Sequence, residues 1–151
     1  MEMKERYPRL EINLAHLKHN VAKVVEKCGS YGIQVAGVIK GATGLPEVAK
    51  QFDEGGAAFI ASSRLEQIED ARNAGIEKPM MLIRIPMLSE IEDVIRLTDI
   101  SLNSELEVIK ALNEEARKQG KLHKVILMAD MGDLREGYWD KEEMTDVAEY
   151  I

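Results

Sequence analysis

The sequence predicts an α/β fold in which helices cover a parallel sheet. Short apolar segments alternate with amphipathic helical segments five times, at intervals of roughly 20–25 residues. The apolar segments are nearly continuous, which is typical of strands that are buried on both faces. A length of 151 residues fits one domain. Right-handed crossovers leave two architectures open, a doubly wound sheet of the flavodoxin type or a barrel.

Apolar runs bounded by glycine, proline or polar residues mark the strands. We expect these strands at residues 35–39, 57–61, 79–85, 100–102 and 124–129. The segments between them repeat apolar side chains at the three- and four-residue spacing of an amphipathic helix. We expect these helices at residues 13–28, 45–54, 62–75, 89–97, 104–119 and 141–151.

Capping residues set the starts of the first three helices. Asn13 is placed to accept a backbone N–H at the start of the first helix. Pro46 suits the first turn of the second helix, where its missing N–H costs no hydrogen bond. Ser62 or Ser63, followed by Glu66, predicts a capping box at the start of the third helix.

Composition excludes several kinds of partner. A net charge of -7 opposes binding to nucleic acid or to an anionic membrane surface. The charged residues 1–6 do not fit a signal peptide, and no apolar run approaches a membrane span, so we expect a cytoplasmic protein. Cys28 is the single cysteine, and the three histidines lack a cluster of further metal ligands. We therefore expect neither a disulfide within the chain nor a metal site.

Polar residues follow the ends of the strands, where parallel α/β folds collect their ligands. Lys40 ends the first strand and is either a solvated charge or an amine that can react with an aldehyde cofactor. Arg84 either forms a salt bridge with Asp130 or faces an anionic substrate group. Asn103 and Arg135 follow the fourth and fifth strands. Neither a dinucleotide-binding nor a P-loop glycine pattern follows the first strand.

Several segments, taken in their order and spacing, resemble the alanine racemase family and within it the ornithine racemase branch. The resemblance covers nearly the whole chain, and Leu17, His19 and Asn20 contribute to it. The segments that carry it are YPRLEINL at 7–14, VAGVIK at 35–40, AFIASSRLE at 58–66, LIRIPM at 82–87, LNSE at 102–105 and GDLREG at 132–137.

The resemblance implies a pyridoxal 5'-phosphate (PLP) dependent amino acid racemase of fold type III. Residues 1–151 would be the first five units of an eight-stranded PLP barrel, with the remaining units and a β-rich domain following and a homodimer as the full-length assembly. Lys40 would form the internal aldimine and act as one of two acid/bases at the substrate Cα. Arg135 would contact the phenolic oxygen of PLP, and Arg84 and Asn103 are candidates for contacting the amino acid substrate.

The sequence departs from the family pattern at two places. Residues 41–44 stand where alanine racemases have a Tyr-Gly-His stretch, and Met128 stands where many carry a lysine that can be carbamylated. The phosphate site and the second acid/base come later in the family, so we expect residues 1–151 alone to be inactive. The alternatives are a non-catalytic PLP carrier, a D-amino-acid aldolase or dehydratase on the same barrel, and a cofactor-free flavodoxin-like binding module.

Overall fold

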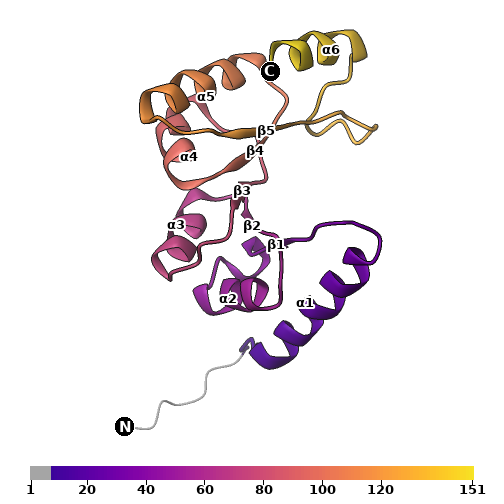
Figure 1. The fold of residues 1–151 in the computed structure, drawn as a ribbon, viewed down its shortest axis with the longest axis vertical. Helices are drawn as coiled ribbons and strands as arrows, with labels where there is room; N and C mark the ends of the chain where they lie inside the picture. Colours follow the sequence, from indigo (N-terminus) through magenta and orange to yellow (C-terminus); the bar gives the residue numbers. More distant parts are fainter. Residues whose placement is uncertain (1–7) are drawn as a thin grey trace.

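A computed structural model describes residues 8–151, so the charged residues 1–6 and Tyr7, on which part of the sequence-based expectation rests, lie outside the described residues. The described residues form six α-helices, five strands and two short 3-10 turns (Figure 1). The helices are α1 (Leu14–Gly29), α2 (Pro46–Glu54), α3 (Leu65–Asn73), α4 (Ile91–Leu97), α5 (Leu106–Gln119) and α6 (Lys141–Tyr150). The strands are β1 (Ala36–Val38), β2 (Phe59–Ser62), β3 (Met80–Leu82), β4 (Ile100–Asn103) and β5 (Lys124–Leu127), and the 3-10 turns are η1 (Lys40–Ala42) and η2 (Leu88–Glu90).

The five strands form one sheet in which they are all parallel and keep the order of the sequence, β1-β2-β3-β4-β5. A doubly wound sheet reverses direction and places its first strand between later ones. Sequential order is instead the order in a barrel, where each crossover moves one strand further in the same direction. The topology therefore decides between the two architectures that the sequence leaves open.

The main core lies between the sheet and the helices. Ile39, Ile60, Met80 and Leu82 are fully buried there, in one cluster with helix residues such as Ile68, Val94, Ile95 and Leu112. Each such buried side chain stabilises the fold by about 1.5–3 kcal/mol. Figure 1 shows α3, α4 and α5 lying along one side of the strands.

The opposite face of the sheet is more open. Val38 pairs with Ala61, and Ala61 pairs with Met81, so these residues lie in one row across β1, β2 and β3. At its two sides the face leaves apolar side chains accessible, with Val38 41% and Ile126 42% exposed. In a closed barrel this face lines the interior, where the side chains of facing strands fill the space.

Two features join the first helix to the rest of the domain. Lys18 Nζ lies 2.7 Å from the carboxylate Oε2 of Glu54, which connects α1 to the end of α2. Gly55 packs closely against Val21. A Cβ at position 55 would lie only 2.6 Å from the Val21 side chain. The small residue at the end of α2 thus lets the two helices approach closely.

Two of the capping predictions are confirmed and one is wrong. Asn13 Oδ1 accepts the backbone N–H of His16 at 3.0 Å, and Pro46 is in the first turn of α2. The capping box at the third helix does not form, because β2 continues through Ser62 and α3 begins only at Leu65. The hydroxyl of Ser62 instead donates to Gln67 Oε1 at 2.6 Å.

Three strands are shorter at their carboxyl ends than the apolar runs predict. β1 ends at Val38, β3 at Leu82 and β5 at Leu127. Pairing with neighbouring strands, which the apolar pattern alone does not report, sets these ends. Lys40 and Arg84 consequently lie in the segments that follow strands. None of the helices in residues 8–151 has both the length and the apolar character that a bilayer crossing requires.

Candidate functional site

The segment after β1 holds the backbone of Lys40 in a tight turn. Ile39 is fully buried, and its N–H extends the sheet by donating to Ala61 O at 2.9 Å. The carbonyl of Ile39 then accepts N–H groups from Ala42 and Gly44, both at 3.1 Å. Lys40 is itself exposed. The fold therefore presents a lysine amine on a fixed backbone at the carboxyl edge of the sheet.

Glycine is required at the end of this turn. Gly44 has a φ of +76°, and a Cβ there would lie 2.5 Å from the side chain of Gln67. Gln67 also accepts the hydroxyl hydrogen bond of Ser62, so the same side chain connects the turn after β1 to the end of β2. The small residues that follow Lys40 thus fix the turn against α3.

Arg84, in the segment after β3, is surrounded by acceptors from the protein itself. Its guanidinium binds the carboxylate of Glu90 through two hydrogen bonds of 2.8 Å, and its Nε donates to Ser63 O at 2.7 Å. Nη1 also donates to the carbonyl of Ile85 at 3.2 Å. The sequence allows a salt bridge between Arg84 and Asp130. This alternative is wrong, because Glu90 at the start of α4 supplies the carboxylate that Arg84 binds. The hydrogen bonds from Arg84 lower the pKa of Glu90.

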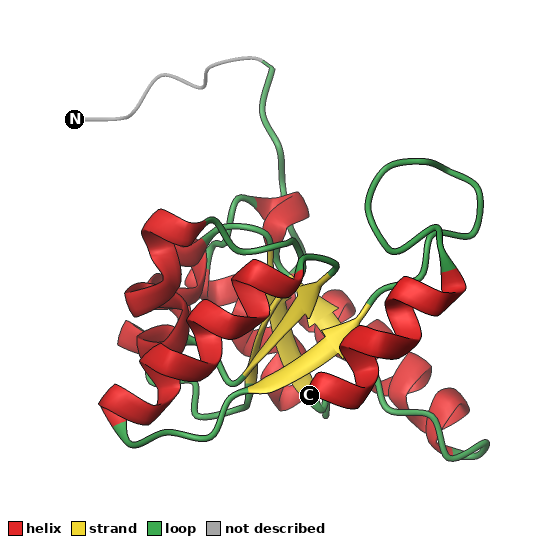
Figure 2. Cartoon of the chain, turned by 90° about the horizontal axis from the view of Figure 1, so that it is seen from above, coloured by secondary structure: helices red, strands yellow, loops and turns green. Residues whose placement is uncertain are grey.

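Asp130 instead organises the segment after β5. Its carboxylate Oδ1 accepts the backbone N–H groups of Gly132 at 2.7 Å and Leu134 at 3.2 Å. The N–H of Asp130 donates to Tyr138 O at 2.9 Å, and the N–H of Tyr138 donates to Met128 O at 2.8 Å. These bonds close residues 130–138 into a loop, visible as the green ring before α6 in Figure 2.

Gly137 allows the two ends of this loop to meet. Its φ is +119°, and a Cβ at this position would lie 2.6 Å from Asp130 N and 2.8 Å from Ala129 C. A backbone atom cannot move aside as the tip of a side chain can. The loop thus depends on glycine at its closing point as well as on the carboxylate of Asp130.

Arg135 lies on this loop and is 73% exposed at its side chain. Its Nε is 3.6 Å from Glu136 Oε1, a longer contact than those of Arg84. Both residues line a pocket of about 300 Å³ that brings together the segments after β3, β4 and β5. The pocket is lined by Ile85, Ser104, Glu105, Asp130, Leu134, Arg135, Glu136 and Gly137. We call it the rim pocket.

Asn103 lies in the sheet, fully buried at the end of β4. Its Nδ2 donates to both the carbonyl and the hydroxyl of Ser101, each at 3.0 Å. The Ser101 hydroxyl also lies 2.8 Å from His123 Nε2. Desolvation by burial lowers the pKa of His123, which favours the neutral imidazole. Asn103 is therefore part of a buried polar network rather than a residue lining the rim pocket.

The sequence does not single out Ser101, and it does not place His123 in this network. The side-chain alternation of β4 contains a signal for Ser101, because it lies two residues before Asn103 and therefore on the same face. No corresponding signal joins His123 to this network, because the register of β4 and β5 sets that contact.

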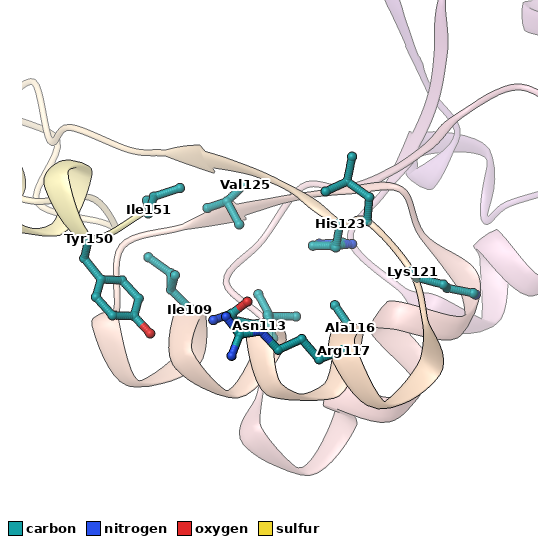
Figure 3. A pocket seen from close by; sticks show the side chains of 11 residues that line it. Ile109, Asn113, Ala116, Arg117, Lys121, His123, Val125, Tyr150 and Ile151 are labelled. Carbon is teal, nitrogen blue, oxygen red and sulfur yellow. The ribbon is translucent and has the colours of Figure 1, made fainter.

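A second pocket, of about 410 Å³, lies at the other end of the domain. Figure 3 shows its wall formed by side chains from α5, from the segment that leads into β5 and from the end of α6, among them Asn113, His123 and Tyr150. Lys121, also at its edge, donates from Nζ to the carbonyls of Ile95 at 2.9 Å and Arg96 at 2.8 Å. This pocket lies at the amino ends of the strands, the end that parallel barrels use for stability rather than for ligands.

The rim thus combines an accessible lysine after β1, an accessible arginine after β5 and a polar pocket across β3 to β5. Among residues 8–151, no group of three or more His, Cys, Asp or Glu side chains is arranged to hold a metal ion. Sequential parallel strands, covering helices and polar groups at the carboxyl edge define a domain of the parallel βα-barrel class, a class whose members bind their ligands at that edge.

Comparison with known proteins identifies the family. Residues 12–151 match the family described as alanine racemase, N-terminal domain, and the chain belongs to this family. It is 38% identical to ornithine racemase of Acetoanaerobium sticklandii over 93% of this chain, and 37% identical to lysine racemase of Thermotoga maritima over 95%. The chain spans 39% and 40% of the lengths of these relatives.

A solved structure of alanine racemase from Clostridium difficile 630 has the same arrangement. It superposes with a TM-score of 0.77 at 26% identity, over 91% of this chain and 36% of that one. The predicted barrel fold and the resemblance to racemases are therefore confirmed.

Proposed function

We propose that residues 1–151 form the N-terminal part of the barrel of a PLP-dependent amino acid racemase. The observation that carries the proposal is Lys40, an exposed amine on a hydrogen-bonded turn at the carboxyl end of β1, in a chain of the alanine racemase family. The chain spans 39% and 40% of the lengths of ornithine racemase and lysine racemase. These shares support our proposal that further barrel units and a second domain belong to the full-length protein.

The residues at the rim fit the cofactor chemically. PLP carries an aldehyde, which reacts with an amine, and anionic oxygens, which attract guanidinium groups. Lys40 would hold the cofactor through its Nζ, and Arg135 would donate to its phenolic oxygen. When bound, PLP withdraws electrons from the substrate Cα and so makes the Cα proton acidic.

Lys40 would also move the proton on one side of the substrate Cα. Racemisation takes a proton from one face and returns one to the other, so a second acid/base is required. We place that group outside residues 1–151, and we therefore expect this segment alone to be inactive. The contacts of Arg84 and Asn103 favour a positioning role for both residues, because their donors are already bound to protein acceptors.

The proposed substrate class rests on identity. The ornithine racemase and lysine racemase are 38% and 37% identical to this chain, whereas two alanine racemases of similar coverage are 28% and 30% identical, so we propose a basic amino acid as substrate. We propose a homodimer for the full-length protein, which light scattering tests by its mass.

Reduction with borohydride tests the role of Lys40. The full-length protein is loaded with PLP, reduced, digested and mapped by mass spectrometry. We expect a pyridoxyl group on Lys40 and on no other lysine, and we expect Lys40→Ala to lose both the label and the formation of D-amino acid. Lys50→Ala, an exposed lysine on α2, is the matched control and should keep both.

A label on another lysine, or none, would overturn the assignment. A protein that carries the label on Lys40 but converts no L-amino acid into its D-form would instead be a PLP carrier. Chiral chromatography of the products separates these outcomes.

A further inference from the structure

The rim pocket contains carboxylates that the proposed PLP chemistry does not use. Three carboxylates, from Glu105, Asp130 and Glu136, line it together with one guanidinium, that of Arg135. These residues come from the segments after β4 and β5, so the fold itself brings the carboxylates together. The pocket therefore carries an excess of negative charge.

The three carboxylates differ in how far the protein already uses them. Asp130 accepts two backbone N–H groups and holds its own loop. Glu136 is only 23% exposed at its side chain, and its contact with Arg135 Nε is 3.6 Å. Glu105 begins α5 without forming a side-chain cap. Glu136 and Glu105 are thus better placed than Asp130 to accept hydrogen bonds from a ligand.

Ser104 gives an independent indication of a ligand. It is 7% exposed, and it lines the same pocket. Its hydroxyl makes none of the hydrogen bonds found among residues 8–151, whereas the other buried serines, Ser62 and Ser101, bind side-chain partners. Among residues 8–151, the fully buried side-chain atoms without a hydrogen-bond partner are Asn103 Oδ1 and His123 Nδ1, so the Ser104 hydroxyl remains accessible from the pocket. It is therefore free to bind a ligand donor there.

We propose that the rim pocket receives the distal ammonium group of a basic amino acid substrate, with Glu136 as its main acceptor and Glu105 and Ser104 as supporting acceptors. An alkylammonium group has three N–H donors, which this set can satisfy. A neutral side chain would leave the carboxylate of Glu136 with only its 3.6 Å contact to Arg135, and this penalty provides the discrimination. The inference rests on the proposed racemase function and deepens it.

The test compares a basic substrate with a neutral one of similar length in the full-length, PLP-loaded protein. We measure kcat/KM for L-ornithine and L-lysine against L-norleucine by chiral chromatography. We expect Glu136→Gln to lower kcat/KM for the basic amino acids by about 10- to 100-fold, mainly through KM, and to leave the value for norleucine unchanged or raised. Glu114→Gln, an exposed glutamate on α5, is the matched control and should change neither value.

A second variant guards against loss of folding. Glu105→Gln should reduce the preference for basic substrates by a smaller factor, with the visible absorbance of bound PLP retained. An unchanged ratio of basic to neutral kcat/KM in both variants would overturn the inference, as would a wild-type protein that prefers norleucine. In either case racemisation itself would still support the proposed function. A wild-type protein that racemises no amino acid would overturn both.

Discussion

The segments after β3 and after β5 each carry an arginine close to a glutamate, yet the two arginines differ in how many of their donors the protein already binds. Arg84 binds Glu90 through two hydrogen bonds of 2.8 Å and also binds the carbonyls of Ser63 and Ile85. Arg135 has one contact of 3.6 Å with Glu136 and is 73% exposed. The side chains of the first pair are 25% and 29% exposed.

The difference shows why position at the carboxyl edge of the sheet does not by itself identify a binding residue. A guanidinium whose donors are bound to its own protein stabilises the rim, because releasing it would leave a partly buried carboxylate without a partner. A guanidinium with few partners can bind a ligand without first breaking other bonds. The segment after β3 therefore supports the site, and the segment after β5 is the one to test for ligand contact.

The largest effect we expect is on activity, from Arg135→Ala in the full-length protein. Loss of a donor that contacts the reacting system should lower kcat/KM by about 100-fold. Because Arg135 is exposed, the urea midpoint of unfolding should change little. An equal loss of activity and stability would show that Arg135, like Arg84, is structural, and the contrast between the two segments would fail.

Arg84→Ala should give the opposite result. It removes four hydrogen bonds and leaves Glu90 without its guanidinium, so the free energy of unfolding should fall by about 2 kcal/mol. Urea denaturation followed by circular dichroism measures the loss. Arg84→Lys should recover only part of it, because an ammonium cannot bind the carboxylate through two parallel bonds. A stable Arg84→Ala protein with reduced activity alone would instead make Arg84 a substrate contact.

The smallest effect we expect is the dependence of the Arg84–Glu90 pair on pH. Hydrogen bonds from Arg84 lower the pKa of Glu90 in the folded state from its ordinary value of 4.5. The folded protein thus binds fewer protons than the unfolded chain. The stabilisation by the Arg84–Glu90 pair is complete above the ordinary pKa of Glu90, and it is lost as the pH falls through the pKa of Glu90 in the folded state.

The comparison of wild type with Glu90→Gln isolates this contribution. The two proteins should differ in unfolding free energy by about 1 kcal/mol more at pH 7 than at pH 3, after allowance for the exposure of the pair. Urea titrations at both values measure it. A difference that stays constant between them would contradict the predicted coupling of Glu90 to Arg84.

Much of the fold could be predicted from the amino-acid pattern. The five strand–helix repeats, the cap at Asn13 and the proline at the start of α2 depend on local chemistry, and the structure confirms them. The capping box predicted at Ser62 is wrong, because local chemistry alone does not set the end of a strand. Pairing with β3 extends β2 through Ser62, and a strand residue cannot at the same time begin a helix.

The site was predictable in part for the same reason. Lys40 and Arg135 follow strand ends, so their place at the rim follows from the topology once the strands are known. The partners of the polar residues at the site do not follow from the topology. Glu90 as the partner of Arg84, Asp130 as the acceptor within its own loop and Ser101 with His123 around Asn103 all depend on how separate segments meet.

The sequence by itself determined that this chain is an α/β domain of the alanine racemase family with a lysine after its first strand, because periodicity, turn residues and motif order are written along the chain. The tertiary structure alone decided which charged groups are satisfied and which remain accessible. Hydrogen bonds and burial depend on distances between residues that are far apart in sequence. For that reason two arginines at equivalent strand ends have different surroundings, and only the structure shows that Arg135 is the accessible one.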